Sequence, residues 1–179
     1  MKTFVKELLI TVGLAVIIFV VARQTIQTYE VYQTSMEPNF HEGQRVVVNK
    51  AVYFWSEPER GDVIVFRAPG TDEDFIKRVI GLPGDTVEIK NGLVYVNGVA
   101  LDEPYIAEAP DYTMPAITIP AGKYFVLGDN RNHSNDSHRD WLVNKEDIHG
   151  KAWLSTWPPA LWGVVPEYAL GDQIAAAGN

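Results

Sequence analysis

An apolar run at residues 8–22 constrains this chain more than any other feature. It carries no charged side chain, and Arg23 follows it directly. The run is shorter than the ~20 residues that a membrane-spanning helix prefers. Phe4, Val5 and the polar flank at residues 24–26 extend it to a sufficient length, because flanking charged side chains can reach the interfaces. The run therefore predicts one helix that can cross a bilayer.

Three kinds of segment could produce such a run. A cleaved signal peptide requires small residues at its cleavage site, and residues 20–23, Val-Val-Ala-Arg, match that requirement poorly. A buried core helix of this length rarely lacks a polar face. An uncleaved membrane anchor therefore fits best, with the lipid bilayer as one partner of the chain.

The charges beside the run set its expected orientation. Lys2 and Lys6 precede it and Arg23 follows it, and positively charged flanks favour the cytoplasmic side. We therefore expect residues 1–24 to form a cytoplasmic N-terminus and a single-pass anchor in the cell membrane. Residues 25–179 should then form one extracytoplasmic domain.

Beyond the anchor, apolar and polar residues alternate with period two, which is typical of strands. The alternation occurs in residues 28–32, 44–49, 61–67, 84–90, 93–96, 123–127 and 151–155. Asn91-Gly92 and Asn97-Gly98 supply two-residue turns, because both residue types tolerate positive φ. Helical periodicity is absent after the anchor, so the domain is predicted to be mainly β.

A looser, proline-rich segment at residues 104–120 is predicted to be a surface excursion between strands. Trp153, Trp157 and Trp162 follow near the end of the strand pattern. Their arrangement favours packing in the core and at sheet edges. The alternative is an aromatic patch in the lipid interface, where indole rings are favoured.

Charge and cysteine content exclude several function classes. The formal net charge is −8, which argues against a nucleic-acid partner, because phosphate binding needs clustered Lys and Arg. The chain has no cysteine, which excludes disulfides and thiolate metal sites.

Ser35 stands out by its context. Pro38 restricts the residue before it to extended geometry, so the segment is stiff and non-helical. It begins a short way past the anchor, and we expect it close to the bilayer surface. Taken alone, Ser-x-x-Pro is common and indicates no more than a surface turn.

Lys77 lies in a predicted strand at residues 74–80, where Phe75, Lys77 and Val79 share one face. Its amine would project between two apolar side chains, and desolvation lowers the pKa of a lysine. A general base requires a pKa near the operating pH, well below the ~10.4 of free lysine. The alternative is an exposed lysine whose stem lies along the surface.

A third stretch, residues 128–138, is dense in loop-forming and hydrogen-bonding side chains. One interpretation is a metal site formed by Asp129, His133, Asp136 and His138. Their spacing matches no known ligand pattern, so neither a metal nor another cofactor is expected. The other interpretation is a supporting loop that fixes the Ser35 and Lys77 side chains.

Together these stretches resemble the motifs of bacterial type I signal peptidases, which are membrane-bound Ser/Lys leader peptidases. Four motifs occur in the family's order: Ser35-Met36-x-Pro38, Arg60-Gly61-Asp62-Val63-Ile64-Val65-Phe66, Lys77-Arg78-Val79-Ile80-Gly81-Leu82-Pro83-Gly84-Asp85, and Gly128-Asp129-Asn130-Arg131 with Ser134-x-Asp136-Ser137. The resemblance covers the chain from the anchor to about Trp157.

The resemblance implies a β catalytic domain at residues 25–179 with an inserted excursion at about residues 91–122. It implies a serine endopeptidase that removes N-terminal signal peptides from exported preproteins. Ser35 would attack the scissile carbonyl, and Lys77 would take its proton. Ser134 would orient the lysine amine, and Asp136 would support the loop through a salt bridge. The Ser35 backbone N–H would form part of the oxyanion hole.

Arg78 and Asp129 belong to the same expected supporting set.

Three departures from the family pattern concern this site. Gln33 stands where many members have a small residue or a serine, and its amide could donate to the oxyanion hole or crowd it. Asn39-Phe40 replaces the usual Thr-Leu. The family's Arg-x-Trp-Gly is replaced by residues 138–142, His-Arg-Asp-Trp-Leu, so either His138 or Arg139 could be the partner of Asp136.

Other functions remain as alternatives at this point. One is a related Ser/Lys maturation peptidase with a single dedicated substrate. A soluble self-cleaving repressor shares the dyad chemistry, but the apolar anchor argues against it. An inactive membrane-tethered β module that binds exported chains is opposed by the presence of both Ser35 and Lys77.

Overall fold

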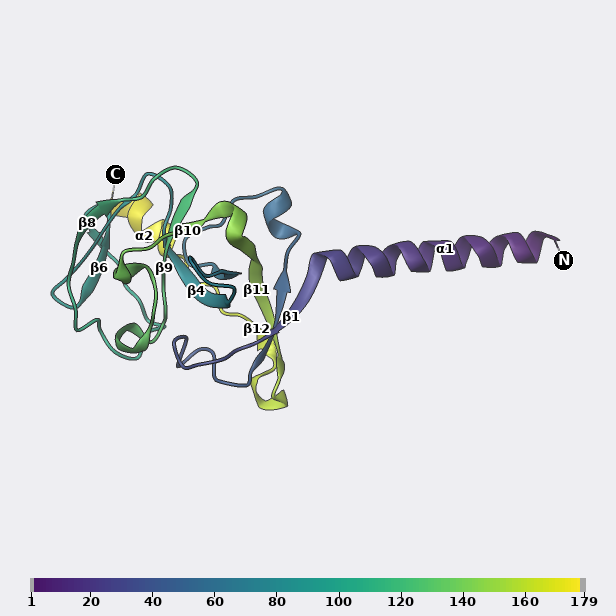
Figure 1. The fold of residues 1–179 in the computed structure, drawn as a ribbon, viewed down its shortest axis with the longest axis horizontal. Helices are drawn as coiled ribbons and strands as arrows, with labels where there is room; N and C mark the ends of the chain where they lie inside the picture. Colours follow the sequence, from purple (N-terminus) through teal and green to yellow (C-terminus); the bar gives the residue numbers. More distant parts are fainter. Residues whose placement is uncertain (1, 178–179) are drawn as a thin grey trace.

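The computed structural model describes residues 2–177, with side chains from residue 3 onward. A long helix, α1 (Lys2–Thr25), projects away from a domain that contains all the other elements (Figure 1). Its side chains are exposed from residue 3 to residue 24, and its length and apolar composition are sufficient to cross a membrane. The predicted N-terminal apolar helix is therefore confirmed. The Lys2 side chain, which contributes to the expected cytoplasmic flank, lies outside the described part.

The anchor helix passes into the domain without a linker. Strand β1 (Ile26–Glu30) starts at the residue after α1 and pairs with β2 (Arg45–Asn49). The Lys50 amide donates a 2.8 Å hydrogen bond to the Thr25 carbonyl, the last residue of α1. The end of the helix is thus joined to the β domain in two ways: the chain continues directly into β1, and a backbone hydrogen bond links it to the residue after β2.

Across residues 2–177 the strands form two antiparallel sheets, one of eight strands and one of four. The larger sheet has the order β1-β2-β11-β3-β4-β9-β10, and β12 pairs with β11. Its remaining strands are β3 (Val63–Arg67), β4 (Asp74–Gly81), β9 (Lys123–Leu127), β10 (Val143–Asn144), β11 (Ile148–Trp157) and β12 (Gly163–Val164). The mainly β prediction is confirmed.

The smaller sheet has the order β7-β6-β5-β8 and lies at the end of the domain far from α1 (Figure 1). Its strands are β5 (Thr86–Lys90), β6 (Leu93–Val96), β7 (Val99–Ala100) and β8 (Met114–Thr118). The predicted turns at Asn91-Gly92 and Asn97-Gly98 have positive φ at all of their residues. Short 3-10 helices occur at Val52–Phe54 (η1), Arg131–His133 (η2), Ser137–Arg139 (η3), Lys145–Asp147 (η4) and Pro159–Leu161 (η5).

Two elements correct the sequence analysis. β8 lies inside the segment that was expected to be a loose excursion, and it pairs with β5. Pro115 is compatible with this strand because β8 is at the edge of its sheet. A second helix, α2 (Leu170–Ala177), was also not expected. It is too short to show a clear helical period, and burial of Leu170 stabilises it instead.

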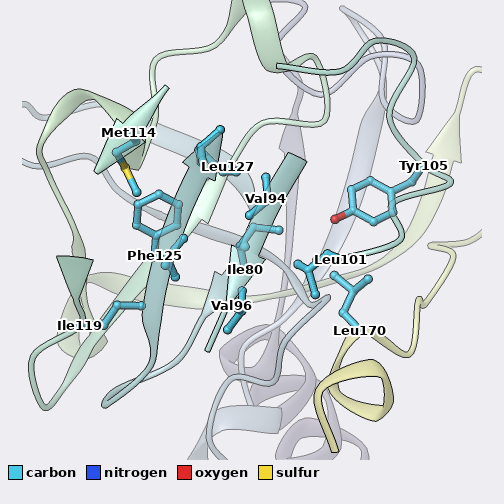
Figure 2. Packing of buried hydrophobic residues seen from close by; sticks show 12 residues of the cluster. Ile80, Val94, Val96, Leu101, Tyr105, Met114, Ile119, Phe125, Leu127 and Leu170 are labelled. Atoms are coloured by element: carbon cyan, nitrogen blue, oxygen red, sulfur yellow. The ribbon is translucent and has the colours of Figure 1, made fainter. Parts of the chain in front are cut away.

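The main core lies between the two sheets (Figure 2). It combines side chains of the larger sheet, such as Ile80 and Phe125, with Val94 of the smaller sheet and Leu170 of α2. At Gly81 an added Cβ would lie 2.3 Å from an Ile119 side-chain carbon and 2.7 Å from a Val87 side-chain carbon of β5, so a larger residue would force the facing side chains to move. This contact places the C-terminal half of β4 against the smaller sheet, while the N-terminal half of β4 pairs with β3 along one edge only.

The indoles of Trp153, Trp157 and Trp162 are 48%, 51% and 66% exposed. They lie on β11 and on the connection from β11 to β12. None of the three is in the core, so the core part of that interpretation is wrong, whereas half-exposed positions on β11 and beside β12 are compatible with packing at a sheet edge. Their contact with a lipid interface stays a prediction.

Candidate active site

The structure brings Ser35 and Lys77 together. Ser35 lies in the turn that connects β1 to β2, and Lys77 lies near the middle of β4. The Lys77 Nζ donates a 2.7 Å hydrogen bond to the Ser35 Oγ and a 2.9 Å hydrogen bond to the Ile76 carbonyl. The two residues are buried, with exposed fractions of 7% for Ser35 and 3% for Lys77.

Burial changes the acid–base behaviour of Lys77. Desolvation lowers its pKa to about 8, while the nearby charges of Asp136 and Asp129 act in the opposite direction. The Phe75 ring lies 5.2 Å from Nζ, on the face of β4 that the alternation predicts. A substantial fraction of the amine is therefore neutral in mildly alkaline solution and can accept a proton.

Apolar side chains of the Ser35 turn pack into the core of the larger sheet and hold the turn in place. Met36 and Phe40 are almost fully buried and pack with Val46, Val63 and Ala152 of β11. Within the turn, the Phe40 amide donates to the Met36 carbonyl at 2.9 Å. The turn is therefore held independently of any contact that Ser35 itself makes.

The loop after β9 holds the same turn through hydrogen bonds. The Asn130 amide donates to the Ser35 carbonyl at 3.1 Å, and the Asn130 side chain donates to the Thr34 carbonyl at 3.1 Å. At Gly128 an added Cβ would lie 2.4 Å from the Ser35 carbonyl and 2.3 Å from the Ser134 Oγ. Only glycine fits at this point, where the loop, Ser134 and the Ser35 turn meet.

Arg78 and Asp129 form a fully buried ion pair under the site. Arg78 Nε and Nη2 donate to the two Asp129 carboxylate oxygens at 2.9 and 2.8 Å, and Nη1 donates to the Gly61 carbonyl at 3.0 Å. The Asn39 amide donates to the same carboxylate at 2.8 Å. The pair thus links β4, the loop after β9 and the Ser35 turn. Asn39, which departs from the family's threonine, takes part directly.

The Asp136 carboxylate pairs with the His138 imidazole. The His138 Nδ1 lies 2.6 Å from Asp136 Oδ1, and the Gly128 amide donates to Oδ2 at 2.9 Å. Burial alone would raise the pKa of Asp136, but these contacts outweigh it and hold the pKa below its ordinary value. The Tyr112 ring stacks on His138 at 4.2 Å. Arg139 is exposed and makes no side-chain ion pair within the described residues.

The other expected site residues differ in their contacts. The Ser134 Oγ is buried beside Gly128 and makes no hydrogen bond to Lys77 among residues 2–177, and it contributes to the lowered pKa of Asp136. Gln33 has φ 74°, in the left-handed region, and its side chain is exposed. In the part that the structure describes, neither the Gln33 side-chain amide nor the Ser35 backbone N–H makes a hydrogen bond. Both donors are therefore free to contact a ligand.

The metal interpretation of the same loop has no geometric support. Asp129 is paired with Arg78 and Asp136 with His138, while His133 is exposed. Nowhere in residues 2–177 do three His, Asp or Glu side chains gather closely enough to hold an ion.

A groove of about 570 Å³ runs along Ser35 and Lys77. Residues 28–33 line one side, and residues 73–77 line the other. Within the described residues β1 pairs with β2 alone, and β9 pairs with β4 only from Arg78 onward. Each wall therefore presents an unpaired backbone edge. An extended peptide can add to such an edge as a further strand.

Sequence reasoning missed several supporting residues. Asn39, Gly128 and Asn130 lie within the recognised motifs, but their contacts with the Ser35 turn follow only from the tertiary structure. Tyr112 lies in the segment assigned to a loose excursion, and nothing in its local pattern indicates a contact with His138.

The fold and the site together describe a class of protein. A buried serine hydroxyl beside a lysine amine of lowered pKa, with free N–H donors and a peptide-sized groove, can carry out acyl transfer as a serine hydrolase with a lysine base. The β domain that holds this arrangement is joined directly to an apolar helix.

Comparison with known proteins identifies the family. The model of the signal peptidase family, peptidase S26, matches residues 1–157. A probable signal peptidase I-1 of Synechocystis sp. is 44% identical over 144 residues, which cover 76% of this chain and 74% of that protein. Signal peptidase IB of Staphylococcus aureus is 38% identical over 177 residues, covering 88% and 92%. This chain therefore belongs to the signal peptidase family.

A solved structure is also similar. The crystal structure of a signal peptidase I from Enterococcus faecalis is 35% identical to this chain, with a TM-score of 0.48. The match covers 54% of this chain and 97% of that one.

Proposed function

We propose that this protein is a membrane-tethered serine endopeptidase that removes N-terminal signal peptides from exported preproteins. The observation that carries the proposal is the 2.7 Å hydrogen bond between Lys77 Nζ and Ser35 Oγ in the wall of a peptide-sized groove. Membership of the signal peptidase family supports the substrate class.

The reaction begins with acylation. Neutral Lys77 takes the Ser35 hydroxyl proton as Oγ attacks the carbonyl carbon of the scissile bond. The Ser35 N–H and the Gln33 amide donate to the oxyanion that forms. The protonated Lys77 then gives its proton to the leaving amine, which departs as the new N-terminus of the mature protein. The signal peptide stays bound to Ser35 as an ester.

Deacylation repeats these steps with water. Lys77, neutral again, takes a proton from a water molecule, which attacks the ester carbonyl. Collapse of this second tetrahedral intermediate breaks the bond to Oγ, and Lys77 returns the proton to Ser35. The signal peptide leaves as a carboxylic acid that releases its proton to solvent and becomes a carboxylate, and the enzyme is regenerated, so atoms and protons balance over the cycle.

The supporting residues act by holding this geometry. Asp129 with Arg78 fixes the loop that bonds to the Ser35 carbonyl. Asp136 with His138 fixes the Gly128 amide of the same loop. Ser134 contributes a buried hydroxyl beside Gly128, where the loop meets the Ser35 turn, which supports a role in orienting the Lys77 amine.

The anchor places the groove where substrates arrive. We propose that α1 crosses the membrane once with its N-terminus in the cytoplasm, so that the β domain, residues 25–179, lies outside. The backbone contact between Lys50 and Thr25 joins the domain directly to the end of the helix. A signal peptide that leaves the bilayer beside α1 would then reach the groove in an extended conformation.

The extended conformation also bears on the cleavage site. Alternate residues of a strand point to the same face, so the residue before the scissile bond and the one two positions earlier both face the groove wall. We propose that both must be small, because shallow pockets reject larger side chains by clash.

The test is cleavage of purified exported precursors by the full-length protein in detergent, with Ser35→Ala as the control. A set of unrelated precursors separates a general signal peptidase from a maturation peptidase with one dedicated substrate. Binding of precursors without any cleavage by the unmodified chain would favour the inactive binding module instead.

A further inference from the structure

The C-terminal strap, which we define as residues 165–170, lies beyond the part of the chain that the family model matches, which ends at residue 157. It nevertheless packs against residues that support the site, at several points. The Val165 amide donates to the Trp153 carbonyl at 2.9 Å, and its side chain joins the cluster that contains Met36 and Phe40. Leu170 is fully buried in the core between the two sheets (Figure 2).

Tyr168 covers the buried cation. The Arg78 Cζ lies 5.2 Å from the Tyr168 ring centroid and 4.2 Å from that of Tyr105, and the two rings are 4.9 Å apart. Gly61 accepts a hydrogen bond from Arg78, and an added Cβ at Gly61 would lie 2.5 Å from the Tyr168 carbonyl. The strap is therefore pressed against the residues that bind the guanidinium.

A series of direct contacts connects Tyr168 to Ser35. Arg78 holds both carboxylate oxygens of Asp129, and the next residue, Asn130, donates its amide to the Ser35 carbonyl. Asp129 also accepts from Asn39 inside the Ser35 turn. Water that reached the ion pair would weaken it, because the attraction between charges falls as the local dielectric rises. Both contacts to the Ser35 turn would then loosen.

We propose that Tyr168 is a positioning residue for the nucleophile, and that it acts through the Arg78–Asp129 ion pair. Its ring excludes water from the guanidinium and stabilises the cation, so the loop after β9 keeps the Ser35 turn in one place. The inference rests on the proposed function in treating Ser35 as the nucleophile. It assigns a catalytic contribution to a segment outside the family match.

Two substitutions at this position separate the ring from the rest of the side chain. Tyr168→Leu removes the ring, whereas Tyr168→Phe keeps it and loses only a hydroxyl that makes no hydrogen bond within the described residues. Ile174→Ala in α2 is the matched control. Ile174 packs against the same core between the sheets but makes no ring or ion contact with Arg78. It therefore loosens the C-terminal segment without exposing the ion pair.

The first measurement is amide hydrogen exchange of the full-length chain in detergent, which requires no activity. In Tyr168→Leu, exchange of the Asn130 amide should accelerate by about tenfold, because its local opening becomes easier. Tyr168→Phe and Ile174→Ala should leave that rate within about twofold of the parent. An unchanged Asn130 rate in Tyr168→Leu would overturn the inference.

The second measurement is steady-state cleavage of a precursor well below each variant's unfolding midpoint. In Tyr168→Leu, kcat should fall by about tenfold with KM within about threefold, since a displaced nucleophile slows chemistry more than binding. Tyr168→Phe should restore kcat. If Ile174→Ala lowers kcat as much as Tyr168→Leu does, the strap has a structural role only and the inference fails. Should the unmodified chain cleave no precursor, the proposed function fails, while the exchange measurement still decides whether Tyr168 holds the Ser35 turn.

Discussion

The Lys77 amine donates a hydrogen bond to the Ser35 hydroxyl at 2.7 Å, although the two residues are 42 positions apart in the chain. β4 supplies the lysine, and the turn between β1 and β2 supplies the serine. Apolar packing of Met36 and Phe40 holds that turn in place.

Replacing either residue of the pair should abolish cleavage while the fold persists. Ser35→Ala removes the attacking oxygen, and Lys77→Arg keeps a charge but cannot accept a proton, because a guanidinium stays protonated. Lys77→Met should also be inactive. This substitution should leave the free energy of unfolding unchanged or raise it, since it removes a buried amine that is costly to charge. Cleavage assays with thermal unfolding of each variant check this, and substantial activity in Lys77→Met would rule out Lys77 as the base.

Cleavage should rise with pH and reach half of its maximum near the lowered Lys77 pKa of about 8. The charged amine is disfavoured in the folded state, so this group destabilises the protein by about 3 kcal/mol below that pKa. Between about pH 8 and pH 10.5 the unfolded chain binds more protons at Lys77 than the folded chain, so its contribution to stability becomes less unfavourable as pH rises.

The measurement is a pH–rate profile of kcat/KM on the purified enzyme. Each of the four histidines is then replaced by alanine in turn. A histidine base would produce a midpoint near ~6.5 instead. Loss of all cleavage in one such variant with an intact fold would reject the Ser35/Lys77 assignment.

His138 should matter more than Arg139. His138→Ala leaves the buried Asp136 carboxylate without its ring partner, which should lower the free energy of unfolding by about 1–3 kcal/mol and reduce cleavage. Arg139→Ala should change the free energy of unfolding by less than about 0.5 kcal/mol, because the side chain is exposed. Chemical denaturation and cleavage of both variants test the ranking. The opposite order would mean that Arg139 is the functional partner of Asp136.

A precursor with Phe in place of Ala immediately before the scissile bond should be cleaved about 10- to 100-fold more slowly. A bulky ring forced into a packed pocket costs about 1–3 kcal/mol. The comparison uses kcat/KM for the two precursors, with a conservative Ala→Ser change as the control. Equal rates for Ala and Phe would contradict shallow pockets in the groove.

The orientation of the anchor is open to a direct test. Protease added outside intact cells should digest residues beyond about position 25 and leave the N-terminal segment protected. The reasons are the Lys2 and Lys6 flank and the fact that residues 2–177 contain one helix that is long and apolar enough to span a membrane. A β domain that stays protected until the membrane is permeabilised would reverse the proposed topology.

The sequence by itself determined the features that depend on neighbouring residues. The apolar run specifies α1, because only a helix satisfies its own backbone in lipid. The alternation around Lys77 specifies a strand with Phe75 on the same face, and Asn91-Gly92 and Asn97-Gly98 specify turns with positive φ. These features are local because they depend on periodicity and on the dihedral preferences of single residues.

The tertiary structure decided the features that depend on which distant segments meet. His138 and Arg139 are adjacent and both could pair with Asp136, and only the packing of Tyr112 on the imidazole shows which one turns inward. β8 forms because β5 offers it a partner edge, and α2 forms because Leu170 fits the core between the sheets. The contact of Tyr168 with Arg78 joins segments 90 residues apart. No local pattern encodes such a contact, because its free energy arises from burial and charge that exist only once the chain has folded.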